Sequence, residues 1–137
     1  MYKRQAGYIP VLAHPERLEL FQNTPTILND FVGRGMLTQF TAGSIIGLFG
    51  KKAEKLTQKY LKEGLVHTLA SDTHRPTGPR TPILSLAYKK VSNSYGDNIA
   101  LKIFSDNPKS IIEGAPNTGQ FTVEIPKSKK THFWKFW

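Results

Sequence analysis

The stretch "YIPVLAHPER" (residues 8–17) leads an apolar run directly into a histidine, an acid and an arginine. Its first six residues have the continuous apolar character of a buried strand. A second stretch, "LVHTLASDTH" (residues 65–74), has the same design, in which a short apolar run is followed by polar and charged side chains. Two strands that end on chemically active residues predict a shared site, and the rest of the chain is interpreted around them.

Apolar runs alternate with helical patterns between these two stretches and beyond them. The predicted strands cover residues 8–13, 36–42 and 65–70. The predicted helices cover residues 24–35, 51–64, 81–96 and 97–114, the last restarting at Asn107-Pro108, with a short helical turn or loop at 44–50 and a short strand at 120–125. Strands separated by helices indicate an α/β fold built on a parallel sheet or barrel.

Length and composition limit the class of protein. A chain of 137 residues suits one domain but is short for a complete barrel enzyme. The absence of cysteine excludes disulfides and thiolate metal sites, so a metal would need histidine and carboxylate ligands. No apolar run approaches the roughly 20 residues that span a bilayer, and "MYKRQAGY" has no signal-peptide core. We therefore expect a cytoplasmic protein.

The charge is strongly positive. Nineteen Lys and Arg against ten Asp and Glu give +9, which favours anionic partners such as phosphate esters, nucleic acid or acidic lipid. The tail "KSKKTHFWKFW" (residues 127–137) combines lysines with aromatic residues and could contact a membrane surface, or it could be a frayed terminus or dock on its own domain. Charge without a recognised binding module does not indicate nucleic-acid binding, so we expect none.

The ends of the two strands carry metal-ligand side chains. In an extended chain, residues two apart point to the same side, so Asp72 and His74 can present an oxygen and a nitrogen to one ion. His14 would add a third ligand, because the carboxyl ends of parallel strands meet at one edge of a sheet. Such a set suits manganese, zinc or iron, and a metal there would activate water and polarise a phosphoryl oxygen. His67, inside the strand, is expected in the core or on the opposite face of the sheet.

Each of these residues also has a simpler interpretation. His14 could be a packed or capping group, since a single histidine after a strand often is. Asp72 could cap the segment that follows it. Arg17 could be a surface residue paired to Glu16 or Glu19. The coincidence of ligand-type residues at two strand ends favours the functional interpretation.

Four segments, in order, carry a family resemblance: "PVLAHPER", "TQFTAGSIIGLFGKKA", "LVHTLASDTH" and "RTP". They resemble the C-terminal part of the PHP-domain tyrosine phosphatases of bacterial capsule and exopolysaccharide systems, the CpsB/CapC family. The resemblance covers roughly residues 5–114. It divides the chain into the C-terminal part of a PHP phosphatase domain (residues 1–114) and a linker with a basic aromatic tail (residues 115–137).

The resemblance implies a fold, a reaction and a cofactor. The fold is a distorted β/α barrel of the PHP type, incomplete in this chain by itself. The reaction is metal-dependent hydrolysis of phosphotyrosine on a partner tyrosine autokinase of capsule or exopolysaccharide biosynthesis. The expected metal is manganese, with iron, zinc and magnesium as alternatives, and the oligomeric state stays open.

The resemblance also assigns roles to particular residues. His14 matches the ligand of the family's His-x-Glu-Arg segment, and Asp72 and His74 match its Ser-Asp-x-His ligands. Arg17 matches the arginine of the first segment, which is expected at the substrate phosphate. Arg80 matches the arginine after the second segment, although the loop "RPTGP" before it is one residue longer than usual.

This sequence departs from the family in one large respect. Members begin with a His-x-His strand and supply further His and Glu ligands before the segments seen here, and this chain has none of them. We therefore expect a fragment that is inactive in isolation. The alternative is a non-catalytic remnant or binding module for phosphate, a kinase or a membrane surface. Another PHP esterase, acting on a small phosphate such as histidinol phosphate, fits the ligands but not "TAGSIIGLFG".

Overall fold

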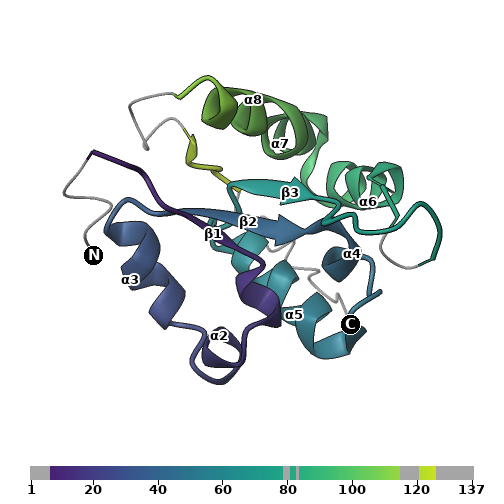
Figure 1. The fold of residues 1–137 in the computed structure, drawn as a ribbon, viewed down its shortest axis with the longest axis horizontal. Coiled ribbons are helices and arrows are strands. Elements are labelled where there is room, and N and C mark those ends of the chain that lie inside the picture. Colours follow the sequence, from purple (N-terminus) through teal and green to yellow (C-terminus); the bar gives the residue numbers. More distant parts are fainter. Residues whose placement is uncertain (1–6, 79–80, 83, 115–120, 126–137) are drawn as a thin grey trace, which may run out of the picture.

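Three short parallel strands form the centre of the molecule. The computed structural model describes residues 7–78, 81–82, 84–114 and 121–125. Its strands are β1 (Val11–Ala13), β2 (Leu37–Thr41) and β3 (Thr68–Ala70), arranged in the order β1-β2-β3 (Figure 1). Both strand pairs are parallel, so all three carboxyl ends lie at one edge of the sheet. The predicted α/β fold with a parallel sheet is confirmed.

Helices cover the sheet on two sides. After β1 the chain forms a 3-10 turn, η1 (Pro15–Arg17), and the helices α2 (Glu19–Asn23) and α3 (Ile27–Gly33). Helices α4 (Ala42–Ile45) and α5 (Gly50–Lys62) connect β2 to β3. The chain then forms α6 (Ser85–Tyr95), α7 (Asp97–Leu101), a π-helical turn η2 (Lys102–Asp106) and α8 (Asn107–Ile112). In Figure 1, α7 and α8 lie on one side of the sheet and α2, α3 and α5 on the other.

The elements begin and end at places that differ from the prediction. Helix α3 begins at Ile27 and not at the start of the predicted helix, because the preceding residues form a turn. Neither η1 nor α2 was predicted, since "PERLELF" is too short to show a helical period. Among the described residues, no helix has both the length and the apolar character needed to cross a bilayer.

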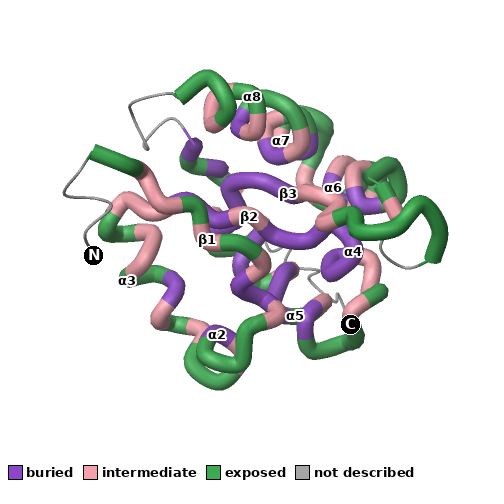
Figure 2. Tube along the Cα trace, viewed as in Figure 1, coloured by how far each residue is buried: buried purple, intermediate pink, exposed green. Residues whose placement is uncertain are grey.

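The burial of the strands follows their position in the sheet. The central strand β2 is almost entirely buried, and Phe40 in it is 1% exposed. The edge strand β1 was predicted as a fully buried strand, and that prediction is wrong. β1 lies at the edge of the sheet and its residues are exposed or only partly buried, with Val11 39% exposed (Figure 2).

Helix α5 supplies much of the core. Its buried residues recur at helical spacing, as the sequence predicted. Tyr60 is completely buried and packs edge-to-face on Phe40, with ring centroids 5.6 Å apart. The Tyr60 hydroxyl donates a hydrogen bond to the carbonyl of Pro25 at 3.0 Å, so the polar end of this core residue is satisfied.

The restart predicted at Asn107-Pro108 is a change of helix type, and the helical path continues through it. Proline has no N–H for the carbonyl four residues earlier, and the chain winds through the wider turn η2 before α8. The Asn107 side chain donates to the carbonyls of His67 (2.7 Å) and Phe121 (3.1 Å). This amide therefore links α8 to the residue before β3 and to the segment 121–125.

The short strand predicted at 120–125 is not formed in its described part, residues 121–125. Phe121 and Val123 are nevertheless buried, so this segment contributes apolar side chains to the core without forming a strand. The carbonyls of this segment are bonded by side chains in place of a neighbouring strand. Besides the bond from Asn107, the Lys102 ammonium donates to the carbonyl of Thr122 at 2.6 Å.

His67 should make the stability of the fold depend on pH. It is buried as predicted, its Nδ1 accepts a hydrogen bond from the Thr38 N–H at 3.1 Å, and burial lowers its pKa from 6.5 to about 4. Below pH 6.5 the unfolded chain binds a proton that the folded chain does not bind. The contribution of neutral His67 to the free energy of unfolding is therefore fully present above pH 6.5. It is lost as the pH drops toward 4, which lowers the free energy of unfolding by about 3 kcal/mol.

Urea unfolding at pH 7, 5.5 and 4 measures this effect. His67→Gln is the matched control, because it fills a similar volume without titrating. The free energy of unfolding of the wild type should fall more steeply with acidification than that of the variant. Equal slopes would contradict the assignment.

Candidate functional site

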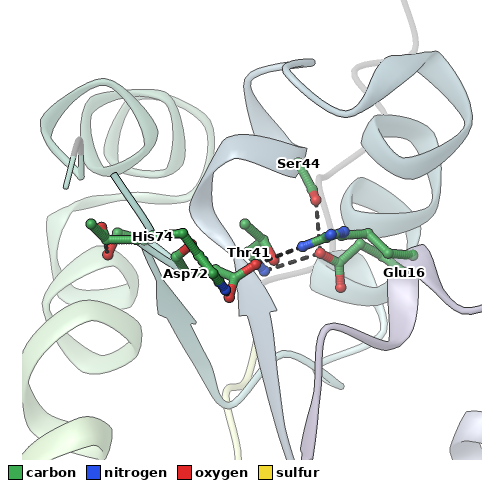
Figure 3. A network of polar contacts seen from close by, with 8 residues as sticks. Glu16, Thr41, Ser44, Asp72 and His74 are labelled. Atoms are coloured by element: carbon green, nitrogen blue, oxygen red, sulfur yellow. Dashed lines mark hydrogen bonds and ion pairs between the residues drawn. The ribbon is translucent and has the colours of Figure 1, made fainter. Parts of the chain in front are cut away.

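Three turns meet at the carboxyl edge of the sheet. The turn after β1 carries His14, Glu16 and Arg17, and the start of α4 after β2 carries Thr41 and Ser44. The turn after β3 carries the third group of polar side chains, at residues 71–74. Figure 3 shows these groups side by side, which is the arrangement expected from parallel strands.

Two of the predicted site residues have an unusual backbone. His14 has φ 39° and Asp72 has φ 53°, and among the described residues these are the two non-glycine residues with positive φ. The left-handed conformation costs an L-residue roughly 1–2 kcal/mol. Residues held in this way are concentrated at functional sites, because the surrounding structure must enforce the conformation. The His14 N–H donates to the carbonyl of Gln39 at 2.7 Å, which fixes the turn to β2.

Glu16 joins the first turn to the second. It is 0% exposed, and its Oε1 accepts hydrogen bonds from the Thr41 N–H (3.0 Å) and from the Ser44 hydroxyl (2.7 Å) (Figure 3). The Gln22 amide donates to the Glu16 carbonyl at 2.8 Å. Burial raises the pKa of Glu16 above 4.5, and the hydrogen bonds to its carboxylate oppose this shift.

Arg17 joins the first turn to the third. Its Nη1 lies 2.6 Å from Oδ2 of Asp72, and its Cζ lies 4.6 Å from the centroid of the Phe49 ring. The side chains of Arg17 and Asp72 are 27% and 19% exposed, so the pair is accessible from solvent. The alternative interpretation, a surface pairing of Arg17 with Glu16 or Glu19, is wrong, because Arg17 pairs with Asp72 and Glu16 is buried.

His74 lies next to Asp72, but not for the predicted reason. Strand β3 ends at Ala70, and the left-handed backbone of Asp72 means that "SDTH" is not an extended segment. The His74 Nδ1 lies 2.7 Å from the Asp72 carbonyl oxygen and 3.8 Å from its Oδ1. The His74 side chain is 54% exposed.

The described residues do not complete a metal centre. No three His, Asp or Glu side chains among them are close enough together to hold a metal ion. The chemistry of the donors is nevertheless suitable, since the Nδ1 of His14 is buried without a hydrogen-bond partner in this part of the chain. The metal roles of His14, Asp72 and His74 stay a prediction.

Arg80 and the tail 127–137 lie outside the described residues.

Sequence reasoning missed Glu16, Thr41, Ser44 and Phe49. A signal for the first three was present. Glu16 lies between His14 and Arg17 in "HPER", and Thr41 and Ser44 lie in "TAGS", so all three follow a predicted strand or end it. Phe49 had no signal, because nothing in "GLFG" indicates that its ring lies against Arg17.

The fold and the three turns define an α/β protein that carries its polar site at the carboxyl edge of a parallel sheet. Residues 2–113 match the family described as "Capsular polysaccharide synthesis, CpsB/CapC". The chain belongs to this family, which confirms the resemblance seen in the motifs.

Individual relatives agree with this membership. The chain is 31% identical over 124 residues to the putative tyrosine-protein phosphatase CapC of Staphylococcus aureus, covering 90% of this chain and 48% of the relative. It is 32% identical to the tyrosine-protein phosphatase CpsB of Streptococcus pneumoniae, covering 77% and 45%. It is 41% identical over 68 residues to the tyrosine-protein phosphatase YwqE of Bacillus subtilis, covering 50% and 27%.

A solved structure is also similar. It comes from the work titled "Crystal structures of YwqE from Bacillus subtilis and CpsB from Streptococcus pneumoniae, unique metal-dependent tyrosine phosphatases". The TM-score is 0.64 at 29% identity, and the match covers 88% of this chain and 45% of the other. The chain thus spans at most about half the length of these relatives.

Glu16 should contribute to stability through its acceptor oxygen and not through its charge. Glu16→Ala leaves the Thr41 N–H and the Ser44 hydroxyl without their buried acceptor, which should lower the free energy of unfolding by about 2–3 kcal/mol. Glu16→Gln keeps an acceptor oxygen at the same place. It should be at least as stable as the wild type at pH 7.

The pH dependence distinguishes the two contributions. A carboxyl whose pKa is raised in the folded state stabilises the fold at low pH, and this contribution is lost as the pH rises from 4.5 through the folded pKa. Urea unfolding should therefore show Glu16→Gln gaining stability relative to the wild type as the pH rises. A Glu16→Gln variant as unstable as Glu16→Ala would show that the charge is needed.

Proposed function

We propose that this chain forms part of the active site of a metal-dependent protein-tyrosine phosphatase of capsule or exopolysaccharide biosynthesis. The observation that carries the proposal is the ion pair between Arg17 and Asp72. It joins two turns that the family's motifs identify and holds a guanidinium group at the carboxyl edge of the sheet. Family membership and the names of the relatives support the same reaction.

In this proposal His14, Asp72 and His74 are metal ligands, and Arg17 and Arg80 bind the substrate phosphate. The imidazole and carboxylate donors suit manganese, with iron, zinc and magnesium as alternatives. When bound, the metal would supply an activated water and polarise the phosphoryl oxygen. The left-handed backbone of the first two ligands supports their role, since such strain is retained where function requires it.

Arg17 is suited to a phosphate monoester. Charge on the non-bridging oxygens changes during phosphoryl transfer, and a planar guanidinium meets two of them with paired, charge-assisted hydrogen bonds. Asp72 accepts one hydrogen bond from this group and keeps it at the site in the absence of substrate. A lysine would supply the positive charge but not the paired N–H donors of the planar guanidinium.

The proposal also covers the substrate protein and the metal ligands that the described residues do not supply. The substrate would be phosphotyrosine on a tyrosine autokinase, as the family resemblance implies. Residues 1–114 would form part of a PHP-type barrel and residues 115–137 a linker and tail, with a cytoplasmic location and a membrane-surface contact of the tail resting on sequence alone. Since the described residues form no metal-holding group, further ligands would come from outside them.

The isolated chain should therefore have negligible phosphatase activity. We expect no hydrolysis of a phosphotyrosine peptide above background with added manganese, because the ligand set is incomplete. Release of inorganic phosphate is the measurement, and Asp72→Ala is the control. Metal-dependent turnover that Asp72→Ala abolishes would show that the chain is a sufficient enzyme.

Arg17→Lys tests the proposed phosphate contact in a longer, active form of the protein. We expect kcat/KM to fall more than about tenfold, a loss of about 1.4 kcal/mol in transition-state stabilisation. Metal content should not change, because the variant keeps all proposed ligands. Wild-type kcat/KM in Arg17→Lys would assign the ion pair with Asp72 a purely structural role.

A further inference from the structure

We infer that Phe49 is a positioning residue for Arg17, and that Gly43 makes room for it. The aromatic ring holds the guanidinium in the orientation in which it can bind a phosphate group. The inference rests on the proposed function for the phosphate, while the positioning itself is a property of this chain.

Arg17 is held from two directions. Asp72 binds it through Nη1 at 2.6 Å, which fixes one edge of the guanidinium. Its Cζ lies over the Phe49 ring, 4.6 Å from the ring centroid, within the roughly 6 Å over which a cation and an aromatic face attract each other. A hydrogen bond at one nitrogen leaves the group free to rotate about that bond. The contact with the ring restricts this rotation.

Gly43 determines where the ring can lie. A Cβ at this position would be 2.7 Å from Cε2 of Phe49, closer than real Cβ atoms come to a neighbour, and 3.3 Å from its Cδ2, which is a tight contact. The Leu48 N–H donates to the Gly43 carbonyl at 2.9 Å, which folds the chain back so that the ring reaches helix α4. Glycine is needed here for space and not for its backbone conformation, because Gly43 lies inside α4 without a positive φ.

The hydrogen bonds of Glu16 connect the segment that carries the guanidinium to the helix against which the ring lies. Glu16 immediately precedes Arg17 in η1, and it bonds Thr41 and Ser44, which flank Gly43 in the chain. Buried hydrogen bonds that do not involve Phe49 thus connect the turn that carries Arg17 to the start of α4, against which the Phe49 ring lies. Removing the ring should therefore release the guanidinium without separating the two turns.

For ligand binding, the consequence is that the Arg17 guanidinium is oriented before a phosphate arrives. Paired hydrogen bonds to a phosphate require the guanidinium plane to face the oxygens, and a group that is already oriented loses less freedom on binding. Phe49 and Gly43 would therefore affect phosphate affinity without contacting the phosphate.

The full 137-residue chain allows a direct test by NMR. The Nε–Hε signal of Arg17 is identified by its absence in Arg17→Lys, and in the wild type it should show the shift caused by a nearby aromatic ring. Phe49→Tyr keeps the ring and should retain this shift. Phe49→Leu, of similar bulk, and Gly43→Ala, which displaces the ring, should both lose it. Amide spectra of the remaining residues show that each variant is folded.

Titration with inorganic phosphate, followed on the same signal, tests the consequence for binding. Phe49→Leu and Gly43→Ala should weaken binding about fivefold, and Phe49→Tyr should resemble the wild type. An unchanged Arg17 signal in folded Phe49→Leu would overturn the inference. A ring-dependent Arg17 signal that phosphate does not perturb in the wild type would keep the positioning role and count against the phosphate role of Arg17.

Discussion

The buried carboxyl of Glu16 is the contact on which the arrangement of this site depends. One of its oxygens accepts hydrogen bonds from Thr41 and Ser44, at the start of the helix that follows the central strand. Because Glu16 stands between His14 and Arg17, this contact fixes both of them relative to the sheet. A surface glutamate at the same position would leave the turn free, and the ion pair across to Asp72 would lose one of its supports.

The main features of the fold could be predicted because the sequence marks them, by the spacing of apolar residues or by turn residues at the ends of elements. Helix α5 has apolar residues at helical spacing, and the three strands lie within segments bounded by turn residues. The failures concern properties set by neighbours in space. The exposure of Val11 depends on what packs on the faces of β1, and residues 121–125 are bonded by the side chains of Lys102 and Asn107. No local pattern contains that information.

The candidate site was predicted only in part: its polar residues at two strand ends were identified, and the buried contacts of Glu16 and the Phe49 ring were not. Arg17 and Asp72 were both identified, but the sequence offered nearby Glu16 and Glu19 as partners for the arginine. The actual partner is 55 residues away in the chain. The expected common face for Asp72 and His74 failed because a residue with positive φ interrupts the extended chain. The position of Arg80 lies outside the described residues, so that assignment stays a prediction.

The exposed outer side of β1 has a consequence for the behaviour of the protein in concentrated solution. Within the described structure, β1 is bonded to β2 on one side only, and the nearby Tyr8 and Val11 are exposed. Such an edge is a template on which a strand of another molecule can add, which is a common route to aggregation. Two features oppose it: the strand has only three residues, and a net charge of +9 makes identical molecules repel one another. The colloidal stability of the chain should therefore decrease as salt screens that repulsion.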